Sequence, residues 1–211
     1  MARVKSLKQQ RAALPPPPPA EEIAAALDDI GQRLAAESLT GIGQLPERLD
    51  LGGRPLLVVA DDLKRRGVGI AEEKAGEARV GTHPLAQALR NRLPCDVLVL
   101  DEQPSADDLD RAAAQIAEAS GVVGATFAHI LCYKGDGTRL PGAQVELWRQ
   151  AAASGKLRAM MLFESPYALA DLPAGTPVVL GYGADSFTLG AACDGLLGER
   201  PCPGRLPVNA G

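Results

Sequence analysis

Four apolar runs of strand length are each followed by polar residues that could do chemistry. These polar segments are residues 60–66 (ADDLKRR), 101–103 (DEQ), 133–137 (YKGDG) and 182–185 (YGAD). Ligands of open parallel sheets bind beyond the carboxyl ends of the strands, so a site is expected in these segments if the sheet is parallel. Their carboxylates could serve as proton donors or acceptors.

Asp61 and Asp62 directly follow the apolar run 55–60 (PLLVVA). Neither the G-x-G-x-x-G pattern nor the G-x-x-x-x-G-K-[ST] pattern comes after them, so dinucleotide-binding and P-loop sites are not indicated. We therefore expect both side chains to be solvated carboxylates of a turn.

The chain contains two histidines. His129 lies within the apolar run 122–131, which predicts a core or interface histidine rather than a catalytic base. His83 precedes Pro84 at a predicted helix start and is expected to be structural. Neither histidine has a persuasive nucleophile and orienting acid in the sequence, so a Ser-His-Asp or Cys-His site is not predicted.

Metal and cofactor sites are not expected. The four cysteines lie far apart, with no C-x-x-C pair and no histidine at ligand spacing: Cys95, Cys132, Cys193 and Cys202. Cys132 and Cys193 lie in apolar runs and are expected to be small core residues.

Helical and strand patterns alternate along the chain. Apolar runs predict strands at residues 39–42, 55–60, 96–100, 122–131, 157–163 and 177–182. Periodic or capped segments predict helices at residues 21–37, 84–93, 106–119, 142–153 and 186–197. In the first helix, Ile23, Leu27, Ile30 and Leu34 share one face.

Most of the predicted strands are continuously apolar rather than alternating. This pattern is typical of strands that are buried on both faces, as in a parallel sheet covered by helices. We predict an α/β fold, a three-layer α/β/α sandwich with a mostly parallel sheet of about five to six strands in a flavodoxin-like topology.

Composition excludes several classes of protein. The net charge of −4 over 211 residues and the interleaved basic and acidic residues do not indicate a nucleic-acid partner. No apolar run approaches the ~20 residues of a membrane span, so no membrane partner is expected. Arg3, Lys5 and Lys8 are not followed by an apolar block, so we expect no secretory signal and a cytoplasmic location.

Five consecutive prolines divide the N-terminal region from the rest of the chain. Polyproline is extended and stiff, so residues 14–20 (LPPPPPA) are predicted to be a linker. We predict a helical segment at residues 1–13, an α/β sandwich domain at residues 21–200 and an extended tail at residues 201–211.

Several motifs resemble the C-terminal α/β domain of glycoside hydrolase family 3. The resemblance rests on Ser165-Pro166-Tyr167 after a strand, a second strand ending at Tyr182, a helix ending in LLG, and residues 203–208 (PGRLPV). Upstream, residues 23–38 followed by LTGI resemble the first helix and strand of that domain. Residues 1–14 resemble the last helix of the barrel domain that precedes it.

The resemblance implies a domain separated from its catalytic machinery. The family's (β/α)8 barrel needs about 250 residues, more than this whole chain, and it supplies the nucleophile. In the β-glucosidase-like branch, the loop corresponding to residues 133–137 carries an acid/base Glu, which is absent here. The absence of this Glu makes the chain more similar to the β-N-acetylhexosaminidase-like branch, in which both catalytic groups belong to the barrel. This implies that the chain has no catalytic residues of its own.

Two functions remain open. In the first, the chain is a non-catalytic domain that packs on a catalytic barrel in cis or in trans, with carbohydrate at the domain interface. Tyr133, Lys134 and Asp136 are then candidates for the rim of the substrate pocket, although the K-G-D-G sequence is also an ordinary turn. In the second, the chain is a stand-alone α/β module that binds a small molecule or has a regulatory role, and it has no glycosidase role.

Overall fold

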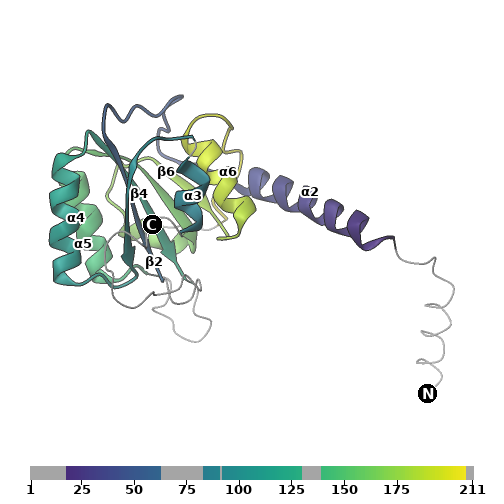
Figure 1. Cartoon of the computed structure of the whole chain (residues 1–211), viewed down its shortest axis with the longest axis horizontal. Helices are drawn as coiled ribbons and strands as arrows, with labels where there is room; N and C mark the ends of the chain where they lie inside the picture. The colour runs from purple at the N-terminus through teal and green to yellow at the C-terminus, as the bar shows by residue number, and fades with distance from the viewer. Residues whose placement is uncertain (1–17, 63–82, 91, 130–138, 208–211) are drawn as a thin grey trace, which may run out of the picture.

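The structure of the chain is a computed structural model that describes residues 18–62, 83–90, 92–129 and 139–207. Six strands form one sheet: β1 (Thr40–Ile42), β2 (Pro55–Asp61), β3 (Asp96–Asp101), β4 (Gly121–Ala128), β5 (Leu157–Glu164) and β6 (Val178–Gly181). Helices lie on both faces of this sheet (Figure 1). The predicted α/β sandwich is confirmed.

The sheet order is β1-β6-β5-β4-β2-β3. The five strands from β2 to β6 run parallel and, numbered from β2, have the flavodoxin-like order 2-1-3-4-5, as predicted. The short edge strand β1 is antiparallel to β6. Every residue of β2 and β4 is buried, in agreement with their continuously apolar sequences.

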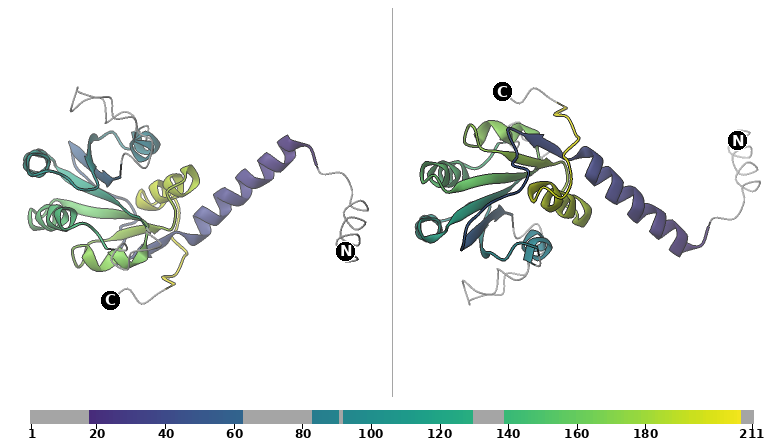
Figure 2. Two further views of the ribbon diagram at one scale, coloured as in Figure 1. Left: turned by 90° about the horizontal axis from the view of Figure 1, so that it is seen from below. Right: turned by 90° about the horizontal axis from the view of Figure 1, so that it is seen from above.

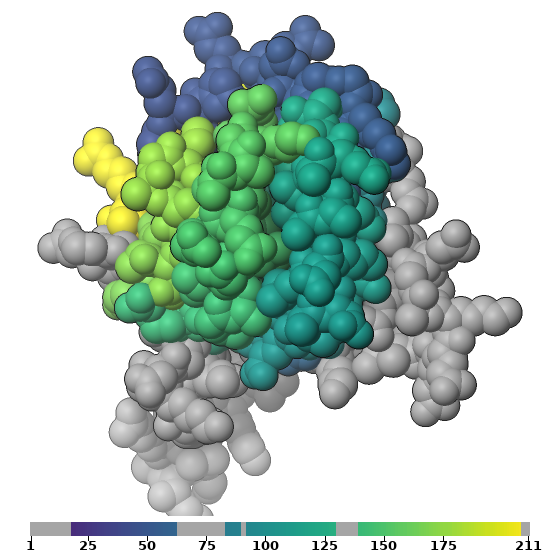
Figure 3. All heavy atoms as spheres, turned by 90° about the vertical axis from the view of Figure 1, so that its left-hand side faces the viewer, coloured from purple at the N-terminus to yellow at the C-terminus, as the bar shows by residue number. Residues whose placement is uncertain are grey.

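Two pairs of helices enclose the sheet. Helices α4 (Ala106–Glu118) and α5 (Gly142–Ala153) pack together on one face through side chains such as Ile116 and Trp148. Their side chains form a continuous outer layer (Figure 3). Helices α3 (Pro84–Arg90) and α6 (Ser186–Leu196) cover the other face.

Capping hydrogen bonds and a glycine with positive φ are found at the helix ends. Ser105 caps α4 in a capping box with Asp108. Thr82, which the sequence suggests as the cap of α3, lies outside the described residues. The His83 ring accepts a hydrogen bond from the Leu85 amide. Gly198 ends the α6 region with φ of 74°, a conformation that favours glycine.

The segment after β5 is a short 3-10 helix, η1 (Pro166–Asp171). Ser165 and Pro166 are buried and anchor it, whereas Tyr167 is 47% exposed. The ring of Tyr167, the last residue of the S-P-Y motif, is therefore not part of the buried anchor.

The C-terminal tail is extended and tied to the start of the sheet. The Gly204 amide donates to the Leu39 carbonyl at 2.9 Å, and Pro203 bridges Thr40. Pro203 and Gly204 thus make an antiparallel contact beside β1.

Helix α2 (Ala20–Ser38) projects from the body and contacts it only near its C-terminal end (Figure 2). Pro19 before it has φ of −52° and ψ of 144°, the extended conformation expected of the linker. The predicted helical segment at residues 1–13 lies outside the described residues. No helix in the described part of the chain is long and apolar enough to cross a membrane.

Candidate functional site

Three charged side chains meet at the carboxyl edge of the sheet, each from the end of a different strand. Asp61 is the last residue of β2, Glu164 is the last residue of β5, and His129 directly follows β4. The chain places β3 on one side of β2 and β4 on the other, so the strand order reverses between β2 and β4. Open α/β sheets bind ligands at this position.

The imidazole of His129 lies between two carboxylates. Its Nδ1 atom is 2.7 Å from Oε2 of Glu164, and its Nε2 atom is 3.1 Å from Oδ1 of Asp61. Burial acts to lower the pKa of His129, but the hydrogen bonds and negative charges of Asp61 and Glu164 outweigh burial and raise the pKa from 6.5 to about 9. His129 is therefore an imidazolium at neutral pH that donates a hydrogen bond from each nitrogen.

His83 completes the network from helix α3. Its Nδ1 atom accepts a hydrogen bond from the Leu85 amide at 3.2 Å, so the ring proton lies on Nε2. Nε2 is 3.2 Å from Oδ2 of Asp61. The fully buried Asp61 carboxylate thus accepts one hydrogen bond from each histidine. The ring of His83 also contacts Phe127 on β4, at a centroid distance of 5.6 Å.

Glu164 has an unusual backbone conformation. Its φ of 74° is the only positive value of a non-glycine residue in the described part of the chain. Such a conformation is strained and persists only where the surroundings enforce it. Here the Glu164 side chain turns toward His129 while the Ser165 amide bonds to the Ala128 carbonyl at 3.2 Å.

A further carboxylate, Glu102, lies beside this network at the end of β3. Burial raises the pKa of Glu102; the positive charge of His129 opposes the rise, and the carboxylates of Asp62 and Asp101 add to it. The backbone carbonyl of Glu102 accepts a hydrogen bond from the Gln144 amide group at 2.7 Å, which ties the end of β3 to helix α5.

This arrangement holds protons rather than transferring them to a ligand. Both nitrogens of His129 face carboxylate oxygens, so neither is free to abstract a proton from a substrate. The side chain of Asp61 is fully buried, so it is not exposed to a ligand at this edge. The network links the ends of three strands and helix α3, and it fixes the edge at which a ligand or a partner would arrive.

Among the described residues, no group of three or more His, Cys, Asp or Glu side chains is arranged to hold a metal ion. Each ring nitrogen of His129 is hydrogen-bonded to a carboxylate.

The structure confirms some of the sequence-based expectations for individual residues and contradicts one of them. The expectation that Asp61 is a solvated turn carboxylate was wrong: its side chain is fully buried, because two histidines replace water as hydrogen-bond donors. The buried positions of His129 and Cys193 are confirmed, and His83, which was expected to be structural, is also buried. The rim candidates Tyr133, Lys134 and Asp136, and also Cys132, lie outside the described residues, so their roles stay predictions.

Sequence reasoning missed Glu164, which it treated only as the residue between a strand and the S-P-Y turn. A signal was available, because Glu164 ends a strand one position before Ser165-Pro166, at the same edge as Asp61. The pairing of Glu164 with Ala128 in the sheet register then places it beside His129.

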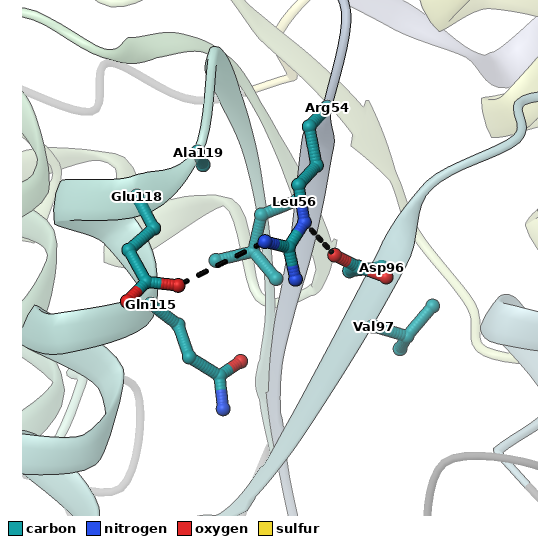
Figure 4. A pocket seen from close by; sticks show the side chains of 7 residues that line it. All are labelled: Arg54, Leu56, Asp96, Val97, Gln115, Glu118 and Ala119. Carbon is teal, nitrogen blue, oxygen red and sulfur yellow. Dashed lines mark hydrogen bonds and ion pairs between the residues drawn. The ribbon is translucent and has the colours of Figure 1, made fainter.

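A groove of about 440 Å³ lies at the opposite, amino edge of the sheet, between β2, β3 and α4 (Figure 4). Arg54 crosses it and donates to Asp96 at 2.8 Å, with Glu118 at 3.9 Å. The guanidinium is therefore paired with two carboxylates of the groove wall. The amino edge is also the end at which open parallel sheets do not bind ligands.

The fold of the chain is similar to that of solved structures that include glycoside hydrolase family 3 enzymes. The chain is similar to a family 3 β-N-acetylglucosaminidase from Paenibacillus sp. str. FPU-7, with a TM-score of 0.67 and 17% identity, covering 99% of this chain and 38% of that chain. It is also similar to a fungal multi-domain family 3 β-N-acetylglucosaminidase, with a TM-score of 0.62 and 18% identity, covering 88% of this chain and 19% of that one.

A third similar structure is the β-glucosidase from Listeria innocua, with a TM-score of 0.62 and 16% identity, covering 92% of this chain and 28% of that chain. No family model matches the chain, and no curated protein matches its sequence. The chain therefore has the fold of a part of these enzymes and spans less than two fifths of their length.

Proposed function

We propose that the chain is a non-catalytic α/β domain of the glycoside hydrolase family 3 type, which packs on a catalytic (β/α)8 barrel in cis or in trans. The parent activity is hydrolysis of terminal β-linked N-acetylhexosamine or glucose residues. The observation that carries the proposal is the match of nearly the whole chain to 38% of a family 3 enzyme. The rest of that enzyme's length is sufficient for a barrel of about 250 residues.

The chemistry at the carboxyl edge supports an inactive domain. A retaining glycosidase needs two carboxyl groups about 5 Å apart on either side of the scissile bond. In this chain, Asp61 is buried between two histidines and Glu164 is hydrogen-bonded to His129. These two carboxylates are committed to internal hydrogen bonds, so they do not form such a pair.

On this proposal, Tyr133, Lys134 and Asp136 contribute to the rim of a substrate pocket that the barrel completes. This proposal is supported by their place in the sequence a few residues after β4, whose C-terminal end lies at the edge where open parallel sheets bind ligands.

A crystal structure of the chain with a bound iminosugar inhibitor tests the proposal. We expect no inhibitor at the strand ends of the isolated domain. An inhibitor held between two acidic side chains of this molecule would contradict the proposal.

One observation favours the alternative of a stand-alone binding module. Glu102, with its raised pKa, lies next to the point where the strand order reverses, and perturbed carboxyls in such places are candidates for ligand contacts. A thermal shift produced by a nucleotide or an amino acid, with none from sugars, would support this alternative over the first proposal.

A further inference from the structure

The C-terminal tail crosses the edge of the sheet as a strap, defined as residues 201–207. Cys202, Gly204 and Leu206 are partly buried, whereas the residues between them are exposed, which is the alternation of an extended strand. Cys202 packs against the core on the α3 and α6 face of the sheet, and Leu206 packs against the core on the α4 and α5 face. The strap therefore passes from one face to the other around β1, the outermost strand.

The middle of the strap lies on the single residue that joins α2 to β1. Helix α2 ends at Ser38 and β1 begins at Thr40, so Leu39 alone connects them. Its φ of −56° and ψ of 123° turn the chain from helical to extended. The Gly204 amide donates to the Leu39 carbonyl at 2.9 Å, and Pro203 forms an antiparallel bridge with Thr40. The direction of α2 depends on the backbone of Leu39, and the strap holds this backbone.

The strap also closes over a chain of hydrogen bonds at this junction. The Thr40 hydroxyl donates to the Ser38 carbonyl at 3.0 Å, so the Tyr182 hydroxyl, at 3.0 Å from the Thr40 hydroxyl, is the donor to it. A Cβ atom at Gly204 would lie 2.2 Å from the Ser38 carbonyl oxygen and 2.6 Å from the Thr40 hydroxyl. The strap is thus in direct contact with the groups that tie the end of α2 to the end of β6.

The rest of α2 has few contacts that could fix its direction. Of its 19 residues, Ala35 and Ala36 are buried, and Gly31 lies against the ring of Phe187 on α6. Alanine and glycine bury little apolar area, so these contacts alone hold the helix weakly. Figure 2 shows the yellow tail passing the inner end of α2, from which the helix projects.

A helix that is held near one end acts as a lever. Glu22 lies about 24 Å from the end of α2, at about 1.5 Å per residue, so a turn of about 10° at Leu39 moves it by about 4 Å. A small change where the strap meets Leu39 is therefore large at the outer end of the helix.

We propose that the strap sets the direction in which α2 leaves the domain. A change that draws the tail away from β1 releases α2 from this direction. Because coupling between two sites is reciprocal, a force or a partner that turns α2 also loosens the tail. The inference goes beyond the proposed function and does not depend on it, since every contact that carries it lies within this chain.

The test measures the distance between two spin labels in the purified full chain by pulsed electron spin resonance. A keto amino acid that carries a label replaces Glu22 near the outer end of α2 and Asp110 on α4, which are both exposed. Labelling through the ketone leaves the cysteines unmodified. A second pair, at Asp110 and the exposed Ala174, reports on the body alone.

Two variants loosen the strap at different points. Gly204→Ala places a methyl group against the Ser38 carbonyl, and Leu206→Ser removes an apolar anchor that lies beyond the junction. We expect both to widen or shift the 22–110 distance distribution by about 4 Å or more, as the length of the lever implies, and to leave the 110–174 distribution unchanged. If Gly204→Ala does not fold, Leu206→Ser decides by the same criterion.

Two matched glycine variants serve as controls. A Cβ atom at Gly53 meets nothing within 4 Å, whereas one at Gly121 lies 2.8 Å from the Leu51 carbonyl oxygen, in a strand three places away from β1. We expect Gly53→Ala and Gly121→Ala to keep the 22–110 distribution of the wild type.

Two results would overturn the inference. An unchanged 22–110 distribution in the strap variants would show that α6 alone fixes α2. A change of equal size in Gly121→Ala would show that α2 responds to any loss of stability and not to the strap.

Discussion

Nδ1 of His129 lies 2.7 Å from Oε2 of Glu164, and this contact joins the ends of the neighbouring parallel strands β4 and β5. The other nitrogen of the same ring reaches Asp61 at the end of β2. One buried imidazolium thereby balances carboxylates from two strands. Without it, their charges would face each other at the edge of the sheet.

Removing one charged partner from this network should lower the stability of the fold. We expect His129→Gln to lower the free energy of unfolding by about 3 kcal/mol, because it leaves the buried Asp61 carboxylate without its charged partner. Asp61→Asn should cost a similar amount. Urea unfolding followed by circular dichroism measures both.

The double variant Asp61→Asn/His129→Gln provides the control. We expect it to lose less than the sum of the two single variants, because neither charge is left alone. Additive losses would show that Asp61 and His129 do not stabilise each other.

The stability of the chain should depend on pH through His129. Its pKa is raised to about 9 in the folded state, against 6.5 for an ordinary histidine. The stabilisation from His129 is therefore fully present below pH 6.5 and is lost as the pH rises through about 9. Unfolding free energies measured from pH 6 to pH 10 should fall over this interval in the wild type and fall less in His129→Gln. Parallel curves for the two proteins would contradict the raised pKa.

The tail should tolerate no side chain at Gly204. A Cβ atom there would come within 2.2 Å of the Ser38 carbonyl oxygen and 2.6 Å of the Thr40 hydroxyl. We expect Gly204→Ala to destabilise the chain by about 2 kcal/mol, because it pushes the tail away from β1. Thermal unfolding measures this loss.

Gly53→Ala is the matched control, since a Cβ atom at Gly53 meets nothing within 4 Å. Its effect should stay within about 0.5 kcal/mol. Equal melting temperatures for Gly204→Ala and the wild type would show that the tail is not held at this point.

Sequence patterns predicted the layers of the fold well. The apolar runs at β2 and β4 required burial on both faces, and the capped segment at residues 106–119 predicted α4. The antiparallel direction of β1 was not predictable from its three residues, because it depends on pairing with β6 at the other end of the chain.

The charge network was harder to predict. Asp61, His129 and Glu164 are separated by 68 and 35 positions, and only the strand order brings them together. Local composition around Asp61 indicated a solvated turn, since a neighbouring Asp and several basic residues follow it. The shared apolar face of Ile23, Leu27, Ile30 and Leu34 on α2 was visible in the sequence, but the exposure of these side chains was not.

The turnover of chromogenic substrates by the purified chain tests the central claim most directly. The claim is that this domain has no carboxylate pair that cleaves a glycoside. With nitrophenyl N-acetyl-β-glucosaminide and nitrophenyl β-glucoside, we expect product formation no faster than in buffer. Steady turnover that is abolished by an acidic-to-amide substitution within this chain, such as Glu102→Gln, would contradict the claim.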